Sequence, residues 1–287
     1  MKRLISALLL VLPLFSSSIN PQFRAEPLAV HPRRLPLANV PDRDASQTLV
    51  FGDHFEQSTL DPAKWISCLP WGRENSPELE YYVDDAFDLS TTSHNRIRAD
   101  APQMAGHAYT SGAMNSQGLF SAQYGYFEAK AKIPRGKGLW PAFWLLAEGQ
   151  DWPKEIDVFE FVGDQPDTVY MTNHWKGPGG EHLSDSGYYT GPDFSQAFHT
   201  FGVDWQPSRI IWYVDGVERF RTNQGVPTEP MYLIANLAVG GDWPGSPDAS
   251  TVFPAYLDID YIPAYQAHGA GTPAKVCLPL VQSSVRD

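Results

Sequence analysis

The segment "EIDVFEF" (residues 155–161) sets three carboxylates, Glu155, Asp157 and Glu160, among Ile, Val and Phe. Side chains two residues apart share a face of a regular strand, so Glu155 and Asp157 would point one way and Glu160 into the core. Burying a lone carboxylate costs several kcal/mol. One extra residue in a β-bulge at Val158–Phe159 would turn Glu160 onto the face of the other two. The sequence therefore predicts a bulge there.

Carboxylates crowded into one row have chemical consequences. Like charges so close cannot all ionise at their usual pKa values, so one raised acid is expected beside an ionised base or nucleophile. Glycoside hydrolysis uses such a pair, about 5–5.5 Å apart in retaining enzymes and about 6.5–9.5 Å apart in inverting ones. A flat strand would separate the two Glu backbones by about 13 Å. Bending at the bulge and the long Glu side chains shorten that gap and favour retention.

The same logic assigns a role to each carboxylate. Glu155 is the expected nucleophile, Glu160 the acid and then the base, and Asp157 a relay that holds a proton or orients Glu155. The alternatives are a calcium site or a salt-bridged surface strand. Calcium usually takes its carboxylates from a flexible loop together with carbonyl oxygens, and not from one apolar strand.

The composition indicates one large domain rich in β-strands. The 287 residues are 43% hydrophobic and include 9 Trp, 13 Tyr and 15 Phe, while 23 Gly and 25 Pro interrupt the chain every few residues. That combination is typical of all-β sandwiches and of surfaces that bind sugars. The formal charge of −12 is opposite to the basic surface that binding to a polyanion requires, so we expect no nucleic-acid partner.

Short alternating windows predict antiparallel strands. One lies in "YGYFEAKAKIPRG" (124–136), and two more are predicted at Thr200–Trp205 and Arg209–Val214. The latter leads through Asp215–Gly216 into a further strand, which is a strong hairpin signal. The last strand is predicted in "AYLDIDYIPAYQ" (255–266). Short turns without helical windows between them predict an all-β sandwich of two stacked antiparallel sheets.

The two ends of the chain differ from this domain. Residues 1–25 begin with Lys2 and Arg3 and continue with an apolar run, which predicts a signal peptide, with an uncleaved anchor as the alternative. We therefore expect a secreted protein, extracellular or periplasmic, without membrane contact after cleavage. Residues 26–48 form a Pro-rich linker, 49–266 the domain, and 267–287 an irregular tail. Cys68 and Cys277 could form one bridge or stay unpaired.

Five stretches carry a recognisable pattern, within a resemblance that runs from about Leu49 to Gln266. They are "GLWPAFWLL", "EIDVFEF", "NHW", "FHTFGVDWQPSRIIWYVDGV" and "NLAVGGDWPGSPDASTVFP". Together they resemble glycoside hydrolase family 16, in particular its laminarinase-like (endo-β-1,3-glucanase) branch. The resemblance implies a β-jelly-roll sandwich with a cleft across its concave sheet, and retaining endo-hydrolysis of β-linked polysaccharides. It maps the nucleophile onto Glu155, the assisting carboxylate onto Asp157 and the acid/base onto Glu160. The extra residue before Glu160 is similar to the version in laminarinases, agarases and carrageenases.

Aromatic side chains are the expected sugar platforms, because their faces stack on the C–H surfaces of sugars. Trp140 and Trp144 share one face before the carboxylate segment, and the resemblance places them under the sugar next to the cleaved bond; core packing is the alternative. Trp243, within "GGDWPG", is an expected exposed platform, since a large aromatic among Gly and Pro has little core to enter.

Several polar residues are further candidates for substrate binding. His174 and Trp175 follow the carboxylate segment, where a hairpin return would bring them beside Glu160, and His174 could tune the acid or be a structural histidine. Asn236 interrupts an apolar strand, so it faces either a ligand or a hydrogen-bonded core site. The loop "WGRENSPELEYYVDD" is similar to one that shapes far donor subsites in the family, which implies sugar contacts for Asn75 and Glu80; relatives commonly carry Gln where this chain has Glu80.

Metal and cofactor expectations are modest. No cofactor is required for the expected chemistry. Many members of the family hold a structural Ca²⁺ on the convex face through an Asp of the last strand, and Asp260 matches that position. A structural Ca²⁺ at Asp260 is therefore possible. We expect a polysaccharide substrate and a monomer.

The leading hypothesis is a secreted retaining endo-glycosidase that hydrolyses internal linkages of β-1,3-glucan. An alternative with the same chemistry is an endo-glycanase or transglycosylase acting on a microbial exopolysaccharide or a galactan. A transglycosylase differs only in whether sugar or water accepts the glycosyl group. An alternative of another class is a carbohydrate-binding lectin on the same scaffold, which would not need an acid and a nucleophile together.

Overall fold

The computed structural model describes residues 47–90, 94–149, 152–267 and 275–276. All of them belong to one unit of the chain, residues 40–287. A 3-10 turn (η1, Asp84–Ala86) lies between the second and third strands. The strands are β1 (Gln47–Asp53), β2 (Glu80–Tyr82), β3 (Phe87–Asp88), β4 (Asn95–Ala99), β5 (Tyr109–Ser111), β6 (Ala113–Asn115), β7 (Phe120–Ser121), β8 (Gly125–Lys132), β9 (Leu139–Ala147), β10 (Glu155–Glu160), β11 (Thr168–Lys176), β12 (His182–Thr190), β13 (His199–Gln206), β14 (Arg209–Val214), β15 (Val217–Thr222), β16 (Met231–Val239), β17 (Ala255–Ala267) and β18 (Lys275–Val276).

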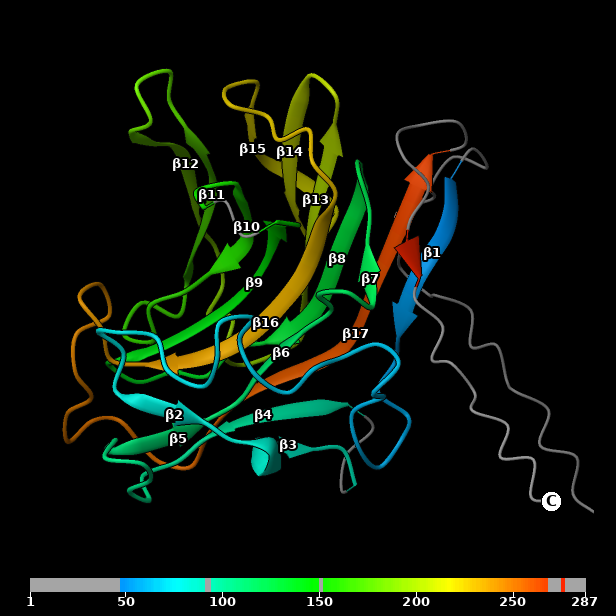
Figure 1. Cartoon of the computed structure of the whole chain (residues 1–287). Coiled ribbons are helices and arrows are strands. Elements are labelled where there is room, and N and C mark those ends of the chain that lie inside the picture. The colour runs from blue at the N-terminus through cyan, green and yellow to red at the C-terminus, as the bar shows by residue number, and fades with distance from the viewer. Residues whose placement is uncertain (1–46, 91–93, 150–151, 268–274, 277–287) are drawn as a thin grey trace, which may run out of the picture. The chain divides into compact units, whose positions relative to one another are not determined.

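Two large antiparallel sheets lie face to face, as Figure 1 shows. The first has the order β15-β14-β13-β8-β17-β4-β3, with β1 also paired to β17. The second has the order β12-β11-β10-β9-β16-β6. Strand pairs β2–β5 and β7–β18 are separate small sheets. The predicted all-β sandwich is confirmed.

The strands predicted from alternation are present. β8, β13 and β14 cover the predicted windows, and β17 covers the last one. Asp215 and Gly216 have φ values of 52° and 73°, so both central residues of the β14–β15 turn are left-handed. A two-residue hairpin turn needs this conformation to match the twist of its strands, and Asp-Gly adopts it readily. The predicted hairpin is confirmed.

The hydrophobic core lies between the two large sheets. Its largest fully buried rings come from both, including Trp205 and Trp212 of the eight-stranded sheet and Phe143 and Phe159 of the six-stranded sheet. On β10, Ile156 and Phe159 enter this core. The other face of the six-stranded sheet is therefore free to carry polar groups, and the candidate site lies there.

Several expectations about the ends of the chain fall outside the described residues. These are the signal peptide at 1–25, the linker except for residues 47–48, and most of the tail. The tail is not wholly irregular as predicted, because β18 pairs with β7. Cys68 is a free, half-buried thiol among the described residues, while Cys277 lies outside them. Within the described ranges, the chain forms no helix with the length and apolarity that a bilayer crossing needs.

Candidate active site

The carboxylate strand β10 contains the predicted bulge. Its register shifts between Asp157 and Phe159 against β9, and between Asp157 and Glu160 against β11. One extra residue on β10 therefore bends the strand. As a result Glu155, Asp157 and Glu160 share one face, opposite residues of β9 that alternate regularly, Leu146, Trp144 and Ala142. The predicted bulge at Val158–Phe159 is confirmed.

A buried tryptophan of the other sheet contacts this bulge. A bulge disrupts the ladder of backbone hydrogen bonds locally. Here the Asp157 carbonyl accepts a hydrogen bond of 2.8 Å from the indole Nε1–H of Trp212, a fully buried residue of β14. The irregular part of β10 is thus tied to the opposite layer of the sandwich.

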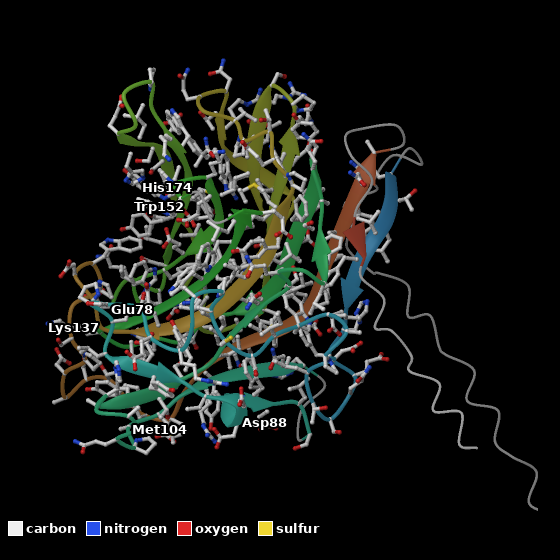
Figure 2. The ribbon with its side chains drawn as sticks, viewed as in Figure 1. Glu78, Asp88, Met104, Lys137, Trp152 and His174 are labelled. Atoms are coloured by element: carbon white, nitrogen blue, oxygen red, sulfur yellow. The ribbon has the colours of Figure 1, made fainter. Side chains whose placement is uncertain are left out.

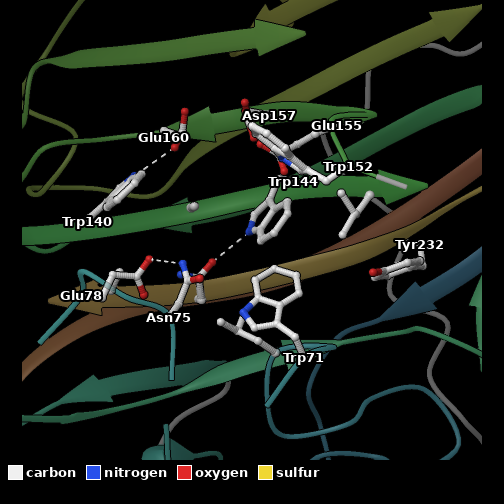
Figure 3. Close-up of a pocket in the computed structure, with 15 residues that line it drawn as sticks. Trp71, Asn75, Glu78, Trp140, Trp144, Trp152, Glu155, Asp157, Glu160 and Tyr232 are labelled. Atoms are coloured by element: carbon white, nitrogen blue, oxygen red, sulfur yellow. Dashed lines mark hydrogen bonds between the residues drawn. The ribbon is translucent and has the colours of Figure 1, made fainter. Parts of the chain in front are cut away.

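The three carboxylates line a pocket of about 640 Å³ on the outer face of the six-stranded sheet (Figure 3). β9, β10 and β16 form its floor, and the segment 69–78 forms one wall. Four indoles line it, from Trp71, Trp140, Trp144 and Trp152. The pocket therefore combines ionisable groups with the aromatic surface that sugars require.

The electrostatics of the carboxylates fit an acid and a nucleophile. Burial, and then the neighbouring Asp157, raise the pKa of Glu155 well above its ordinary value, while His174 opposes that rise. Burial raises the pKa of Asp157 to about 8. Burial and then Asp157 raise the pKa of Glu160 to about 8, against the hydrogen bond from Trp140. Because the three groups share one low-dielectric site, they retain at least one proton at neutral pH.

Trp140 and His174 flank the carboxylates from two sides. Trp140 Nε1–H donates a hydrogen bond of 3.0 Å to Glu160 Oε1, drawn as a dashed line in Figure 3. His174 Nε2 lies 3.0 Å from Asp157 Oδ2 and 3.7 Å from Glu155 Oε1. These contacts hold Glu160 from one side, and Asp157 with Glu155 from the other.

A second histidine supports His174. The Nδ1 atom of His174 lies 2.7 Å from Nε2 of His182 on β12. One hydrogen is shared between these two nitrogens, so the tautomer of one ring sets that of the other. The His182 ring packs on Trp152, with the ring centres 4.6 Å apart. Burial and His174 lower the pKa of His182. Figure 2 shows Trp152 and His174 on the same side of the sandwich as Glu78.

A hydrogen-bond network crosses the floor on the other side. Trp144 Nε1–H donates to Asn236 Oδ1 at 2.9 Å, and the Asn236 amide donates to the Tyr82 hydroxyl at 3.2 Å. That hydroxyl donates to Glu78 Oε2 at 3.1 Å, while Asn75 donates to Glu78 Oε1 at 2.6 Å. Asn236 thus lines the pocket and is also hydrogen-bonded within the protein. It combines the two expected environments, a side chain that faces a ligand site and a hydrogen-bonded amide.

Residues 77–262 match the family described as glycosyl hydrolases family 16. The match covers more than half of the chain. The chain belongs to glycosyl hydrolases family 16.

Family 16 relatives cover most of the described sandwich. A beta-glucanase of Rhodothermus marinus is 33% identical over 254 residues, covering 78% of this chain and 87% of that protein. An endo-1,3-1,4-beta-glycanase of Rhizobium meliloti is 32% identical over 268 residues, which is 84% of this chain and 55% of that protein. The chain therefore spans only about half the length of the latter relative.

A solved structure confirms the fold. The catalytic domain of an endo-1,3-beta-glucanase (laminarinase) from Thermotoga petrophila superposes with a TM-score of 0.70 at 35% identity, covering 77% of this chain and 98% of that domain. The family 16 sandwich of this chain is accordingly a jelly roll, as the resemblance implied.

Against this family 16 framework, some predicted contacts need correction. His174 lies opposite Glu155 in the register, while Tyr170 and not His174 lies opposite Glu160. Trp175 follows His174 directly on β11, so its side chain points to the other face of the strand, and its ring lies against the backbone of Gly225. Trp175 therefore does not line the pocket, because strand alternation turns it away.

Glu80 also departs from its expected place. It is fully buried, and its Oε2 accepts the backbone amide of Val239 at 2.8 Å. Burial, and then Glu78, raise the pKa of Glu80 well above its ordinary value. Glu78 lines the pocket in its place, beside Asn75. Trp140 and Trp144 line the pocket as expected, and Trp243 packs edge-on against Trp140 at its margin.

The sequence reasoning missed two pocket tryptophans. Trp71 and Trp152 are 50% and 53% exposed. Both stand next to Pro or Gly, in "PWG" and "DWP", which is the signal that singled out Trp243. Glu78 and Tyr232 also line the pocket, and neither carries a comparable signal in the sequence.

The possible structural Ca²⁺ of family 16 does not fit well at Asp260. Its carboxylate lies 2.8 Å from Lys130 Nζ, and the neighbouring Asp258 pairs with Lys132 at the same distance. Ca²⁺ binds through several oxygen ligands. A carboxylate that is already paired with an ammonium group is a poor ligand, because the ammonium competes with the ion for its oxygens. By spacing alone, Glu155, Asp157 and His174 offer three ligand atoms within 4.8 Å of one another.

Proposed function

We propose that this family 16 glycoside hydrolase is an endo-β-glucanase that cleaves internal β-1,3 linkages by retaining double displacement. The observation that carries the proposal is the bulge that turns Glu160 onto the face of Glu155 and Asp157, inside a pocket lined by indoles. The names of the relatives, a beta-glucanase and a laminarinase, support glucan as the substrate.

In the first step the Glu155 carboxylate attacks the anomeric carbon as its bond to the glycosidic oxygen breaks. Glu160 donates its proton to that oxygen, and the leaving sugar departs as an alcohol. The raised pKa of Glu160, about 8, keeps this proton available at neutral pH. A covalent glycosyl ester on Glu155 remains.

In the second step Glu160, now ionised, removes a proton from water, and the oxygen attacks the anomeric carbon. The ester bond to Glu155 breaks, so that both Glu residues return to their starting protonation states. Asp157 is buried beside Glu155, and its Oδ2 lies 3.0 Å from His174 Nε2. It holds the proton that lets Glu155 ionise beside it, and release of that proton is opposed by the same burial.

A second candidate substrate is a mixed-linkage glycan. The Rhizobium meliloti relative, which matches 84% of this chain, is named for 1,3-1,4-β linkages. Laminarin, mixed-linkage glucan, agarose and succinoglycan separate the possibilities when the products of each are analysed by size. We expect laminarin to be cleaved fastest, with oligosaccharides of several lengths from the first minutes. Cleavage of agarose or succinoglycan alone would replace the proposed substrate.

The substitution Glu155→Gln tests the chemistry. It removes the nucleophile while keeping a similar shape, so release of new reducing ends should fall at least about a thousandfold. Binding of laminari-oligosaccharides, measured by calorimetry, should stay within a few-fold of the wild type. Glu56→Gln, at an exposed Glu outside the pocket, is the matched control. Activity of Glu155→Gln within a few-fold of the wild type would refute the assignment.

We also propose that the protein is exported and acts as a monomer. The basic and apolar start of the sequence supports export. N-terminal sequencing of the protein recovered from the medium or periplasm would locate the cleavage, and sedimentation would give the oligomeric state.

A further inference from the structure

The face that carries the carboxylates continues beyond the pocket onto β11 and β12. Glu160 lies opposite Tyr170 on β11, and Tyr170 lies opposite Tyr188 on β12. Directly paired residues of adjacent strands project from the same face. Tyr170 and Tyr188 therefore extend the row of Glu160 across two further strands, over about 10 Å at the usual strand spacing.

A chain of ring contacts joins these tyrosines to the pocket. Trp140, which lines the pocket, packs on Trp243 with ring centres 5.4 Å apart. Trp243 packs on Tyr170 at 4.9 Å, and Tyr170 lies 6.5 Å from Tyr188. Trp243 is 43% exposed and Tyr188 is 71% exposed. Exposed rings scattered singly need no explanation, but these form one continuous surface that begins beside Glu160.

The remainder of this face suits neutral sugars. β12 alternates along its whole length, and its exposed positions hold Ser184, Ser186 and Thr190 besides His182 and Tyr188. Its carboxylate Asp185 belongs to the other face, where it accepts a hydrogen bond from Thr222. The exposed side of β12 therefore offers hydroxyls, one imidazole and one aromatic ring, and no charged carboxylate.

The opposite side of the carboxylates is built differently. The segment 69–78 lies over β16 and β6, because backbone hydrogen bonds hold the chain on either side of it. The Leu79 amide donates to the Val239 carbonyl of β16, and the Asn115 amide of β6 donates to the Ile66 carbonyl. β16 and β12 lie on opposite sides of β10 in the sheet order. A polysaccharide cleaved at an internal bond has sugars on both sides of that bond. Those on one side meet the wall of Trp71 and Glu78 (Figure 3), and those on the other must leave over β11 and β12.

We propose that the outer face of β11 and β12 is an extension of the substrate groove, with Tyr170 and Tyr188 as its sugar platform. Its ligand is the part of a neutral β-glucan chain that lies beyond the cleaved bond from the Trp71 wall. The proposal rests on the proposed function, since it assigns further sugars of the same substrate.

The test compares substrates of increasing length. Tyr188→Ala removes a ring that is 71% exposed and packs on Tyr170, so the fold should be kept. The kcat/KM for laminarin and for long β-1,3-gluco-oligosaccharides should fall about fivefold to tenfold, the size of one lost aromatic contact. For the shortest oligosaccharide that the wild type cleaves, the loss should be much smaller. Tyr170→Ala with Tyr188→Ala should widen the difference.

Tyr256→Ala is the matched control, because Tyr256 is a partly exposed tyrosine of β17 in the other sheet. It should leave the length dependence as in the wild type. A loss for Tyr188→Ala that is equal at all lengths, or no loss at any length, would overturn the extended groove alone. A wild-type protein that cleaves no β-1,3-glucan would refute the proposed function, and the extended groove with it.

Discussion

At the scale of single residues, the environment of Glu160 decides whether the site can act as an acid. Burial and the nearby Asp157 favour its neutral form, whereas the Trp140 indole favours its ionised form by donating to Oε1. The proposed mechanism needs the neutral form of Glu160, so activity should fall as pH rises through about 8. It should also fall at low pH, because Glu155 must be ionised and its pKa is raised.

Replacing Trp140 by Phe should move the alkaline limit of kcat/KM to higher pH. The substitution removes the only factor among these that stabilises the ionised form through a direct hydrogen bond, so the pKa of Glu160 rises further. Initial rates on laminarin between about pH 4 and about pH 10 measure the limit. Trp243→Phe is the control, since Trp243 contacts Trp140 through its ring alone. A limit that stays in place or moves to lower pH would contradict the role given to Trp140.

Residue types indicated much of the site but not all of it. The carboxylate trio and the two tryptophans of β9 could be predicted because spacing along one strand decides which side chains share a face. The inward position of Glu80 could not be predicted, because its carboxylate is held by the amide of Val239, 159 positions away in sequence. The prediction for Trp175 was wrong, because neighbouring residues of a strand face opposite sides and His174 already faces the carboxylates.

At the scale of elements, the bulge in β10 connects the fold to the chemistry. It was predictable from polarity alone, since a regular strand would bury Glu160 in the core. Its anchor was not predictable, because Trp212 lies 55 positions away in sequence and reaches the bulge from the other sheet. Contacts between layers depend on how the two sheets stack, which periodicity does not specify.

Trp212→Phe should weaken both the fold and the activity. The Asp157 carbonyl would lose its indole partner, which costs about 1–3 kcal/mol for a buried acceptor, and a looser bulge would misplace the carboxylates and lower kcat about tenfold or more. Urea unfolding and laminarin hydrolysis measure the two effects.

Trp205→Phe is the matched variant for that comparison. Trp205 is also a fully buried tryptophan of the eight-stranded sheet, and it donates at 3.1 Å to the carbonyl of Pro227, a residue outside β10. It should lose similar stability and keep its kcat. Equal losses of kcat in both variants would show that Trp212 has no particular role at the bulge.

At the scale of the whole described unit, the inner and outer faces of the two stacked sheets have different roles. Their inner faces make the core. The outer face of the six-stranded sheet carries the three carboxylates, the two tryptophans of β9, and Tyr170 with Tyr188. The sandwich itself was predictable from short alternating windows and turn residues. The extent of the groove was not, because it arises from strands adjacent in space, and the register of β11 against β12 becomes visible only in the structure.

The anomeric configuration of the first product tests the central claim most directly. If the bulge brings Glu155 and Glu160 close enough for a glycosyl ester to form on one and be hydrolysed with the help of the other, the configuration at the cleaved carbon is kept. Proton NMR of laminarin, followed from the moment the enzyme is added, should show the β-anomer of new reducing ends first, with the α-anomer appearing only through later mutarotation. The α-anomer appearing first would mean inversion, and would contradict the account.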